Sequence, residues 1–495
     1  METKQESLVY ARNVALAGIA ELAGGLHLLV RLAILTRLLG PSEYGVWAIL
    51  WATVMLVTPV AVMGLAMTMI RFLAAETDRD KIGSGFFSIL FAVLASSLVV
   101  GLVMILISGP LALSLSGDSD YSILFKLGLL MIAGQALSRV VITFFRTFRR
   151  MKLYVAAKLV QPVVEAGLLV AVLLGGLGIR GALFSVVIAD LAMVSFAMFF
   201  VLRQVGFHWP RWNLLKPYLK YGIPLIPNVA MLWIANAGDR YMLGWLAGIE
   251  AVGIYGAAYE LSRSIVLLTG AVGVVLFPTI VRFHELGNVS ATKSYLQYSI
   301  KYVMTLAIPA ATGMSVLAVP LLRLISTEDF VAGRSIVCYV SAGMVLLAFY
   351  QMCVFVIHLS KKTYWTTLLL GISAGSNIVM NLLLIPPLGI EGAAIATLIS
   401  YGILGALTFC KARQYLAFDL QPVFLLKSLF SSAIMAVCLL LINPVGLGAL
   451  AFSIVTGIVV YFVVLFTLRG LDRREWRMLV RFVASGRTTG SAKRL

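Results

Sequence analysis

Long apolar runs dominate this chain of 495 residues. Hydrophobic residues make up 61% of the sequence and charged residues only 12%, a balance far from that of soluble domains. A helix needs about 20 apolar residues to cross the roughly 30 Å of hydrocarbon in a bilayer, and an isolated strand there would leave backbone groups unpaired. The sequence therefore predicts an all-α polytopic membrane protein with about 14 transmembrane helices. The expected spans begin near Asn13, Val46, Ile82, Tyr121, Tyr154, Gly181, Tyr221, Gly256, Tyr298, Ala332, Tyr364, Gly392, Phe424 and Gly446.

The chain also repeats itself. Residues 177–182 (LGIRGA) return as residues 388–393 (LGIEGA), 211 positions later (388 minus 177), and residues 39–45 (LGPSEYG) align with 252–255 (VGIY) at an offset of 208 between Gly45 and Gly253. Two halves of six helices each are expected, and because six is even, the axis relating them runs along the membrane normal. The predicted division is 1–205 and 206–416 for the two bundles, 417–470 for two appended helices and 471–495 for a basic cytoplasmic tail.

The formal charge of +18 is spread over alternate connections. The basic residues do not form one block with interleaved aromatic residues, so nucleic acid is not an expected partner. By the positive-inside rule, the basic connections and both termini face the cytoplasm, which predicts a multi-pass protein of the cell (cytoplasmic or inner) membrane. The even-numbered connections carry Arg71, Arg79 and Lys81; Arg146, Arg149, Arg150 and Lys152; Arg203, Arg211, Lys216 and Lys220; Arg282 and Lys293; Lys361 and Lys362; and Lys411 and Arg413.

Several short stretches resemble a known family of transporters. They are residues 39–45, 239–244 (DRYMLG), 253–259 (GIYGAAY), 377–381 and 385–394 (IPPLGIEGAA). They are similar to the O-antigen (Wzx-type) flippases of polysaccharide biosynthesis, a branch of the multidrug/oligosaccharidyl-lipid/polysaccharide (MOP) exporter superfamily. The resemblance implies a MATE-like, V-shaped pair of helical bundles that carries lipid-linked sugars across the bilayer by alternating access. It also implies membrane lipids, and glycosyltransferases or a polymerase of the same pathway, as partners.

Charged side chains within the apolar spans point to a functional site, because each costs on the order of 3 kcal/mol at a helix centre. On the first helix, Glu21 and Arg31 share one face at 100° per residue. Subtracting the offset of 208 from 239 gives 31, so Arg31 and Asp239 are repeat-equivalent positions of opposite charge. We predict that this pair closes the external side of the transporter. The alternative is that Arg31 pairs with Glu21 or another neighbour.

A lipid diphosphate needs compensating cations, and arginine suits phosphate because of its forked donors. The candidates are Arg31, Arg37, Arg240 and Arg263. Glu260, three residues before Arg263, is a candidate for gating or ion coupling, with an internal pair that contributes only to folding as the alternative. Glu21 is the expected protonation site. Structural roles are expected for Arg139, Glu165 and Asp190.

Pro224 and Pro227 lie close together at the start of the seventh span and predict a flexible joint, although prolines are common in static membrane helices. No folded extramembrane domain, metal motif or phosphate-binding Gly-Lys-Ser/Thr loop is evident, so neither an enzyme nor a cofactor is expected. Coupling to protons or sodium stays open. The predicted function is the flipping of a polyprenyl-(di)phosphate-linked oligosaccharide from the cytoplasmic to the outer leaflet. A MATE-type cation-coupled drug antiporter is the alternative.

Overall fold

The described residues of the computed structural model fold into helices only. The structure describes residues 18, 23–116 and 121–470, except for the side chains of residues 115–116, 225 and 268–279. No strand occurs among the described residues. Residues 23–38 form an N-terminal helix. In the first half it is followed by α2 (Pro41–Val62), α3 (Leu65–Leu73), α4 (Arg79–Ser116), α5 (Ser122–Thr147), α6 (Met151–Leu174) and α7 (Gly178–Val205).

The second half begins after a short connecting segment. That segment consists of η2 (Trp212–Leu214), α8 (Leu215–Gly222) and η3 (Ile223–Leu225). It leads to α9 (Ile226–Ala247), α10 (Ile249–Glu285), α11 (Val289–Val316), α12 (Ala318–Ile325), η4 (Glu328–Gly333), α13 (Arg334–Leu359), α14 (Tyr364–Leu388) and α15 (Ile390–Tyr415). The last two helices are α16 (Pro422–Ile442) and α17 (Leu447–Thr467).

Ten of the described helices are long and apolar enough to span a membrane, or eleven if α11 and α12, bent by 78° at their junction, count with them. The N-terminal helix, α9 and α10 stand where three further spans are expected, and α9 and α10 carry the charged side chains that lower their hydropathy. The number fourteen stays a prediction for these three helices. The all-α polytopic fold is therefore confirmed.

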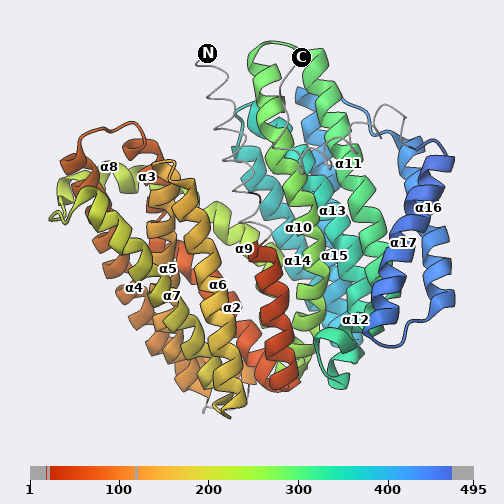
Figure 1. Ribbon diagram of the computed structural model, residues 1–495, viewed down its shortest axis with the longest axis horizontal. Coiled ribbons are helices and arrows are strands. Elements are labelled where there is room, and N and C mark those ends of the chain that lie inside the picture. Colours follow the sequence, from red (N-terminus) through yellow and green to blue (C-terminus); the bar gives the residue numbers. More distant parts are fainter. Residues whose placement is uncertain (1–17, 19–22, 117–120, 471–495) are drawn as a thin grey trace.

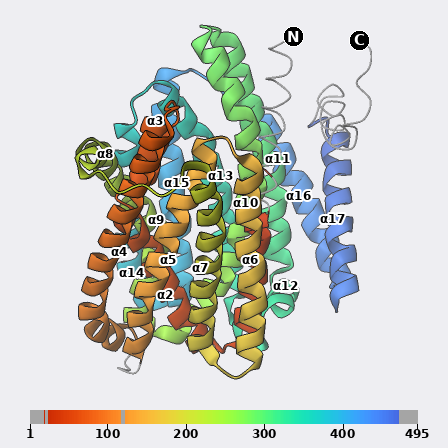
Figure 2. The same ribbon diagram turned by 60° about the vertical axis from the view of Figure 1, so that its left-hand side comes forward.

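The helices form two groups that diverge in a V (Figure 1). One group holds α3 to α7, the other holds α10 to α17, and α2 and α9 lie between them. The two groups converge at the end opposite α8. Helices α16 and α17 stand at the outer edge of the second group in both views (Figures 1 and 2), as an appendage would.

The repeated glycine motif adopts the same backbone conformation in both halves. Gly178 has φ 53° and begins α7, and Gly389 has φ 57° and separates α14 from α15. A positive φ favours glycine, which has no Cβ to clash with the following carbonyl. Both copies therefore place a glycine of positive φ where a new span begins, although three residues separate α6 from α7 and one separates α14 from α15.

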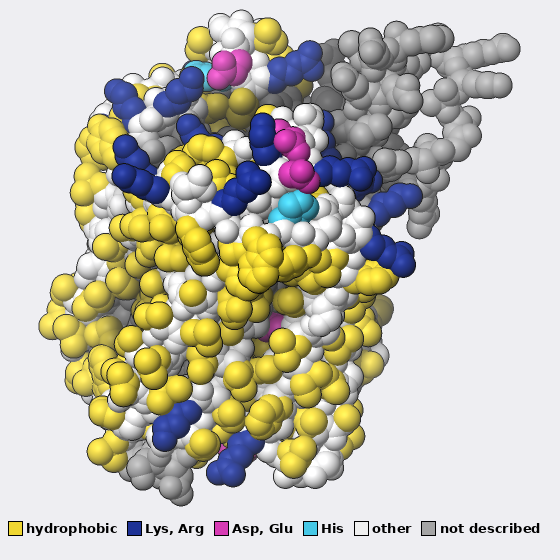
Figure 3. Space-filling model, turned by 90° about the vertical axis from the view of Figure 1, so that its left-hand side faces the viewer, with side chains coloured by type: hydrophobic (Ala, Val, Ile, Leu, Met, Phe, Trp, Pro, Cys, Tyr) yellow, Lys and Arg dark blue, Asp and Glu magenta, His cyan; other side chains and the backbone are white. Residues whose placement is uncertain are grey.

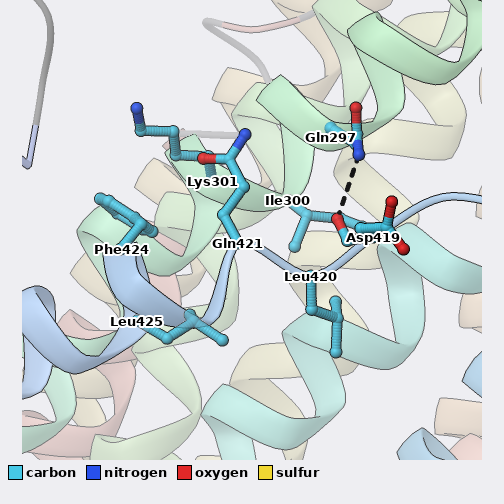
Figure 4. A pocket seen from close by; sticks show the side chains of 8 residues that line it. All are labelled: Gln297, Ile300, Lys301, Asp419, Leu420, Gln421, Phe424 and Leu425. Carbon is cyan, nitrogen blue, oxygen red and sulfur yellow. Dashed lines mark hydrogen bonds between the residues drawn. The ribbon is translucent and has the colours of Figure 1, made fainter.

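The connection to the appended helices is fixed to α11 by polar contacts. Gln297 Nε2 donates to the backbone oxygen of Asp419 at 3.2 Å, and the Asp419 carboxylate lies 3.7 Å from Lys293 Nζ (Figure 4). Beyond it, α16 packs on α11, and Ser428 and Tyr461 join α16 to α17 with a hydroxyl pair at 2.8 Å. Helices α16 and α17 are therefore attached to the rest of the protein mainly through α11.

Candidate functional site

Glu260 of α10 connects two arginines in the second half. Its Oε1 accepts from Arg240 Nη2 of α9 at 3.0 Å, and its Oε2 accepts from Arg263 Nη1 at 3.2 Å. Arg240 also donates to the Asn236 carbonyl oxygen at 3.0 Å and lies 4.7 Å over the Tyr259 ring. Glu260 therefore forms the internal pair with Arg263 that was the alternative to a gating role. It also joins α10 to α9.

Asp239 occupies the neighbouring position on α9 and is satisfied on one side only. Its Oδ2 accepts from the Tyr255 hydroxyl and, at 3.4 Å, from the Thr397 hydroxyl of α15. Its Oδ1 is buried, lies 3.8 Å from Arg240 Nη1 and has no hydrogen-bond donor among the described residues. Asp239 thus keeps an unused acceptor in the interior of the second half.

A separate charged group lies in the first half. Glu165 of α6 accepts from Arg31 Nη1 at 3.5 Å, and its other oxygen lies 3.2 Å from His27 Nε2. The Arg31 guanidinium stacks 3.9 Å over the Trp51 ring of α2. These contacts hold the N-terminal helix between α6 and α2.

This arrangement differs from the expected pair between Arg31 and Asp239. Arg31 pairs with Glu165 within its own half, and Asp239 pairs with groups of the second half. Glu165, for which a structural role is expected, lies buried against the N-terminal helix. Equivalent positions in two repeats face each other only when the helices have the same rotation about their axes, and side-chain packing sets that rotation separately in each half. Glu21 lies outside the described residues.

Asp190 of α7 has neutral partners. Its carboxylate accepts from Gln135 Nε2 at 2.8 and 2.9 Å, from Gln161 Nε2 at 2.5 Å and from Ser138 Oγ at 3.4 Å. These bonds join α5, α6 and α7, which agrees with a structural role. Arg139, on the same turn of α5 as Ser138, is exposed and has no ion-pair partner among the residues that the structure describes.

The exposed part of these groups is cationic. The side chains of Glu165, Asp239 and Glu260 are 3%, 2% and 14% exposed, whereas that of Arg263 is 53% exposed. Arg263 lies 14 residues from the start of α10 at Ile249 (263 minus 249), within the expected span. A guanidinium at that depth is costly in hydrocarbon, so its exposed side indicates access to water rather than to lipid. A ligand that enters from the water therefore contacts Arg263 rather than the buried carboxylates of Asp239 and Glu260.

Arg37 lies apart from these groups. Its Nη2 donates to the Leu324 carbonyl oxygen at 2.5 Å, and Thr36 Oγ1 donates to the Ile325 carbonyl oxygen at 2.7 Å. Both carbonyls belong to the last turn of α12, where the helix dipole favours a cation. Arg37 is therefore a bridge between the halves, in contrast to its expected role as a cavity cation.

Two glycines bring the halves into backbone contact. A Cβ on Gly253 of α10 would clash with the Pro41 carbonyl oxygen of α2, and one on Gly45 would clash with the Ile249 carbonyl oxygen. Further along α2, Trp233 Nε1 donates to the Ala52 carbonyl oxygen at 2.7 Å, and Thr53 bonds to Tyr241. Helix α2 of the first half is thus packed against α9 and α10 of the second.

The α-helical path is interrupted where the two prolines lie. Pro224 belongs to η3 and Pro227 is the second residue of α9, so the helical path changes type between α8 and α9. Their role as a hinge stays a prediction. Among the described residues, no group of three or more His, Cys, Asp or Glu side chains is placed to hold a metal ion.

Sequence reasoning missed His27 and Trp51, and it named Glu165 for a structural role without finding its partners. One signal was available, because His27 precedes Arg31 by four residues and shares its face, as a histidine that joins the same acid would. No sequence pattern marks Trp51 as the ring beneath Arg31, because it lies on another helix and is one of several apolar aromatic residues in that run.

The fold is that of the polytopic membrane proteins of the MATE-like class. The inward closed conformation of the lipid II flippase MurJ superposes with a TM-score of 0.75 at 17% identity, covering 90% of this chain and 97% of that one. An inward-facing multidrug resistance MATE family transporter of the MOP superfamily gives a TM-score of 0.65 at 15% identity, covering 81% and 98%.

The sequence comparisons identify the family. The model of the polysaccharide biosynthesis protein family matches residues 10–284, more than half of the chain. The chain belongs to this family. It is 25% identical over 430 residues to the probable flippase AglR of Haloferax volcanii, covering 82% of this chain and 85% of AglR. It is 22% identical over 283 residues to the probable low-salt glycan biosynthesis flippase Agl15 of the same organism, covering 55% and 60%.

Proposed function

We propose that this protein flips a polyprenyl-(di)phosphate-linked oligosaccharide from the cytoplasmic to the outer leaflet by alternating access. Its family, its similarity to two probable flippases of Haloferax volcanii and the fold that it shares with a lipid II flippase support this assignment. The sugar headgroup crosses between the two helical groups, and the polyprenyl chain stays in the surrounding lipid.

The water-facing Arg263 carries the argument for an anionic headgroup. Glu260 holds Arg263 in place and also pairs with Arg240 of α9, whose side chain is only 6% exposed, so Arg263 is the guanidinium that a ligand can reach. Preorganised arginines bind phosphate oxygens through charge-assisted bonds without first losing side-chain freedom. Arg31, stacked on Trp51 in the first half, offers a third cation that can approach the same headgroup when the halves move.

The sidedness of the substrate path follows from the position of the basic connections. On the face of the first half that Figure 3 presents, Lys and Arg side chains gather at the end that holds α3 and α8, above a broad apolar band. By the positive-inside rule this is the cytoplasmic end. The two groups diverge toward it, so this conformation supports loading from the cytoplasm, with α2 and α10 in contact on the outer side.

Replacing Arg263 tests the phosphate assignment. We expect Arg263→Ala to abolish flipping of the native lipid-linked oligosaccharide in proteoliposomes, while the protein still inserts and unfolds near the wild-type temperature. The arginine is half-exposed and its ion pair contributes little to stability. Arg282→Ala, at the far end of the same helix, is the control and should flip normally. Normal flipping by Arg263→Ala would refute the role of this residue.

The alternative is a cation-coupled drug antiporter, because MATE transporters share the fold. A cationic drug needs a carboxylate that it can reach. Here Glu165 and Asp239 are buried, and Glu260 is occupied by two arginines. Binding of a fluorescent drug cation with an affinity that falls on Glu260→Gln substitution would favour the antiporter.

We further propose that Asp239 couples transport to a proton or a sodium ion. The support is its unused, buried Oδ1, since a hard cation or a proton would satisfy an oxygen that now lacks a donor. Flipping in proteoliposomes with imposed sodium or proton gradients should depend on the gradient, and Asp239→Asn should remove that dependence. Asp190→Asn is the matched control, because three side chains already donate hydrogen bonds to Asp190. Equal gradient dependence in Asp239→Asn and wild type would exclude this role.

A further inference from the structure

A groove runs along the outer face of α14, away from the charged groups. It is a shallow hollow lined by Tyr364, Thr367, Leu368, Gly371 and Ile372, all of α14, and it lies open to the outside. No heavy atom lies within 4 Å of the position of a Cβ on Gly371 or, one turn later, on Gly375. The buried side chains of α14, such as Asn377 and Asn381, lie on other faces of the helix. We call this hollow the α14 groove.

Two lysines stand together at the end of the α14 groove. Lys411 Nζ of α15 lies 3.7 Å over the ring of Trp365, the neighbour of Tyr364, and 5.6 Å from the Tyr415 ring. Lys362 Nζ, from the connection before α14, lies 5.0 Å from the same Tyr415 ring. Aromatic rings thus hold two ammonium groups near each other from different elements.

These ammonium groups lack an acidic partner in the described part of the chain. Lys411 donates to the Gln414 side-chain oxygen at 2.8 Å, which is a neutral acceptor, and no carboxylate lies within ion-pair distance of either lysine there. Both ammonium groups lie within 5.6 Å of the centre of the Tyr415 ring, so their positive charges repel each other. An anion bound between them would remove that repulsion.

The position of the groove restricts what this anion can be. The walls are apolar except for the Tyr364 and Thr367 hydroxyls, and they lie on the lipid-facing side of a membrane span. Hydrocarbon fills such a hollow in a bilayer, and basic pockets at the cytoplasmic ends of membrane helices favour anionic lipid headgroups. A ligand that meets both conditions has an acyl chain and a phosphate.

We propose that the α14 groove binds an anionic phospholipid of the cytoplasmic leaflet. One acyl chain lies along Gly371 and Gly375, and the phosphate lies between Lys362 and Lys411. The site is separate from the path of the transported headgroup, and it does not depend on the identity of the flipped substrate. Its place on α14, which packs against α9, would make the bound lipid part of the support for the helix that carries Asp239.

Lipid titration of the purified full-length protein tests this site. Native mass spectrometry should show tighter binding of phosphatidylglycerol than of phosphatidylcholine of the same chain length. Lys362→Gln with Lys411→Gln should weaken phosphatidylglycerol binding about 25-fold and leave phosphatidylcholine unchanged, because each lysine near an anionic headgroup contributes about fivefold. Lys216→Gln with Lys220→Gln, two exposed lysines of α8, is the matched control and should keep the preference.

A second variant tests the groove itself. Gly371→Leu fills open space, so we expect it to fold and to lose the tight phosphatidylglycerol site. An equal loss in the α8 control, an unchanged preference in both α14 groove variants, or stronger binding of polyprenyl phosphate than of phosphatidylglycerol would each overturn the proposal. The unfolding temperature in phosphatidylcholine identifies a variant that is merely misfolded. The single substitution Lys411→Gln, at the end of α15, is then tested in place of that variant.

Discussion

The buried carboxylates of this protein have three kinds of partner. Glu260 is shared by two arginines, Glu165 by an arginine and a histidine, and Asp190 by neutral amides and a hydroxyl. A carboxylate held by amides can stay buried without a cation, whereas a carboxylate between two arginines is needed by both of them. The two kinds of group should therefore respond differently to the loss of one negative charge.

This difference gives a prediction for Glu260. Glu260→Gln keeps the shape of the side chain but leaves Arg240, which is 6% exposed, without its acid at 3.0 Å. Breaking a buried ion pair in this way costs about 3 kcal/mol or more, so the purified variant should unfold at a clearly lower temperature. Glu250→Gln, an exposed residue in the first turn of α10, should change it little. Equal unfolding temperatures for Glu260→Gln and wild type would contradict the pairing.

At the scale of helices, the halves are joined where their backbones are closest. Gly45 of α2 and Gly253 of α10 are repeat-equivalent, and each lies against backbone of the other helix. Small residues let membrane helices approach closely, where van der Waals packing holds them together. In a transporter of this shape, the contact that closes the outer side must also open, and a glycine contact has no interlocked side chains to separate.

Alanine normally stabilises a helix relative to glycine, but at these two positions we expect it to lower the free energy of unfolding. Gly253→Ala places a Cβ against the Pro41 carbonyl oxygen, so α2 and α10 must move apart, at a cost of about 1–3 kcal/mol. The control is Gly402→Ala on α15, which meets only a Leu346 methyl at 3.8 Å and should leave stability unchanged or raise it by up to about 1 kcal/mol. Thermal unfolding of both variants measures the two signs, and a stabilised Gly253→Ala would show that the helices are not in contact there.

At the scale of the whole molecule, the sequence predicts what depends on local pattern. The spans follow from runs of apolar residues, and the positive φ at Gly178 and at Gly389 follows from a glycine repeated in the same motif. The separation into halves at about residue 205 stays a prediction. The family follows from a few motifs because they shape helix ends, which related chains share.

The partners of the charged residues could not be predicted in the same way. Arg31 and Glu165 are 134 positions apart, and their contact requires the rotation of two helices about their own axes. Hydropathy does not determine that rotation when a helix is apolar nearly all round. The same holds for Arg37, whose partner is the end of a short helix, α12, that runs across the main direction of the bundle.

The direction of the repeat axis can be tested by the sidedness of the connections. Arg180 and Glu391 are equivalent at the offset of 211, as are Arg150 and Lys361, and all four are exposed. Parallel halves place the members of each pair on the same side of the membrane, whereas inverted halves place them on opposite sides. In a protein whose Cys338, Cys353, Cys410 and Cys438 are replaced by serine, a membrane-impermeant maleimide should label Arg180→Cys and Glu391→Cys in intact cells. It should label Arg150→Cys and Lys361→Cys only after the membrane is opened, because basic connections stay in the cytoplasm. Labelling of Arg180→Cys and Glu391→Cys from opposite sides would rule out parallel halves.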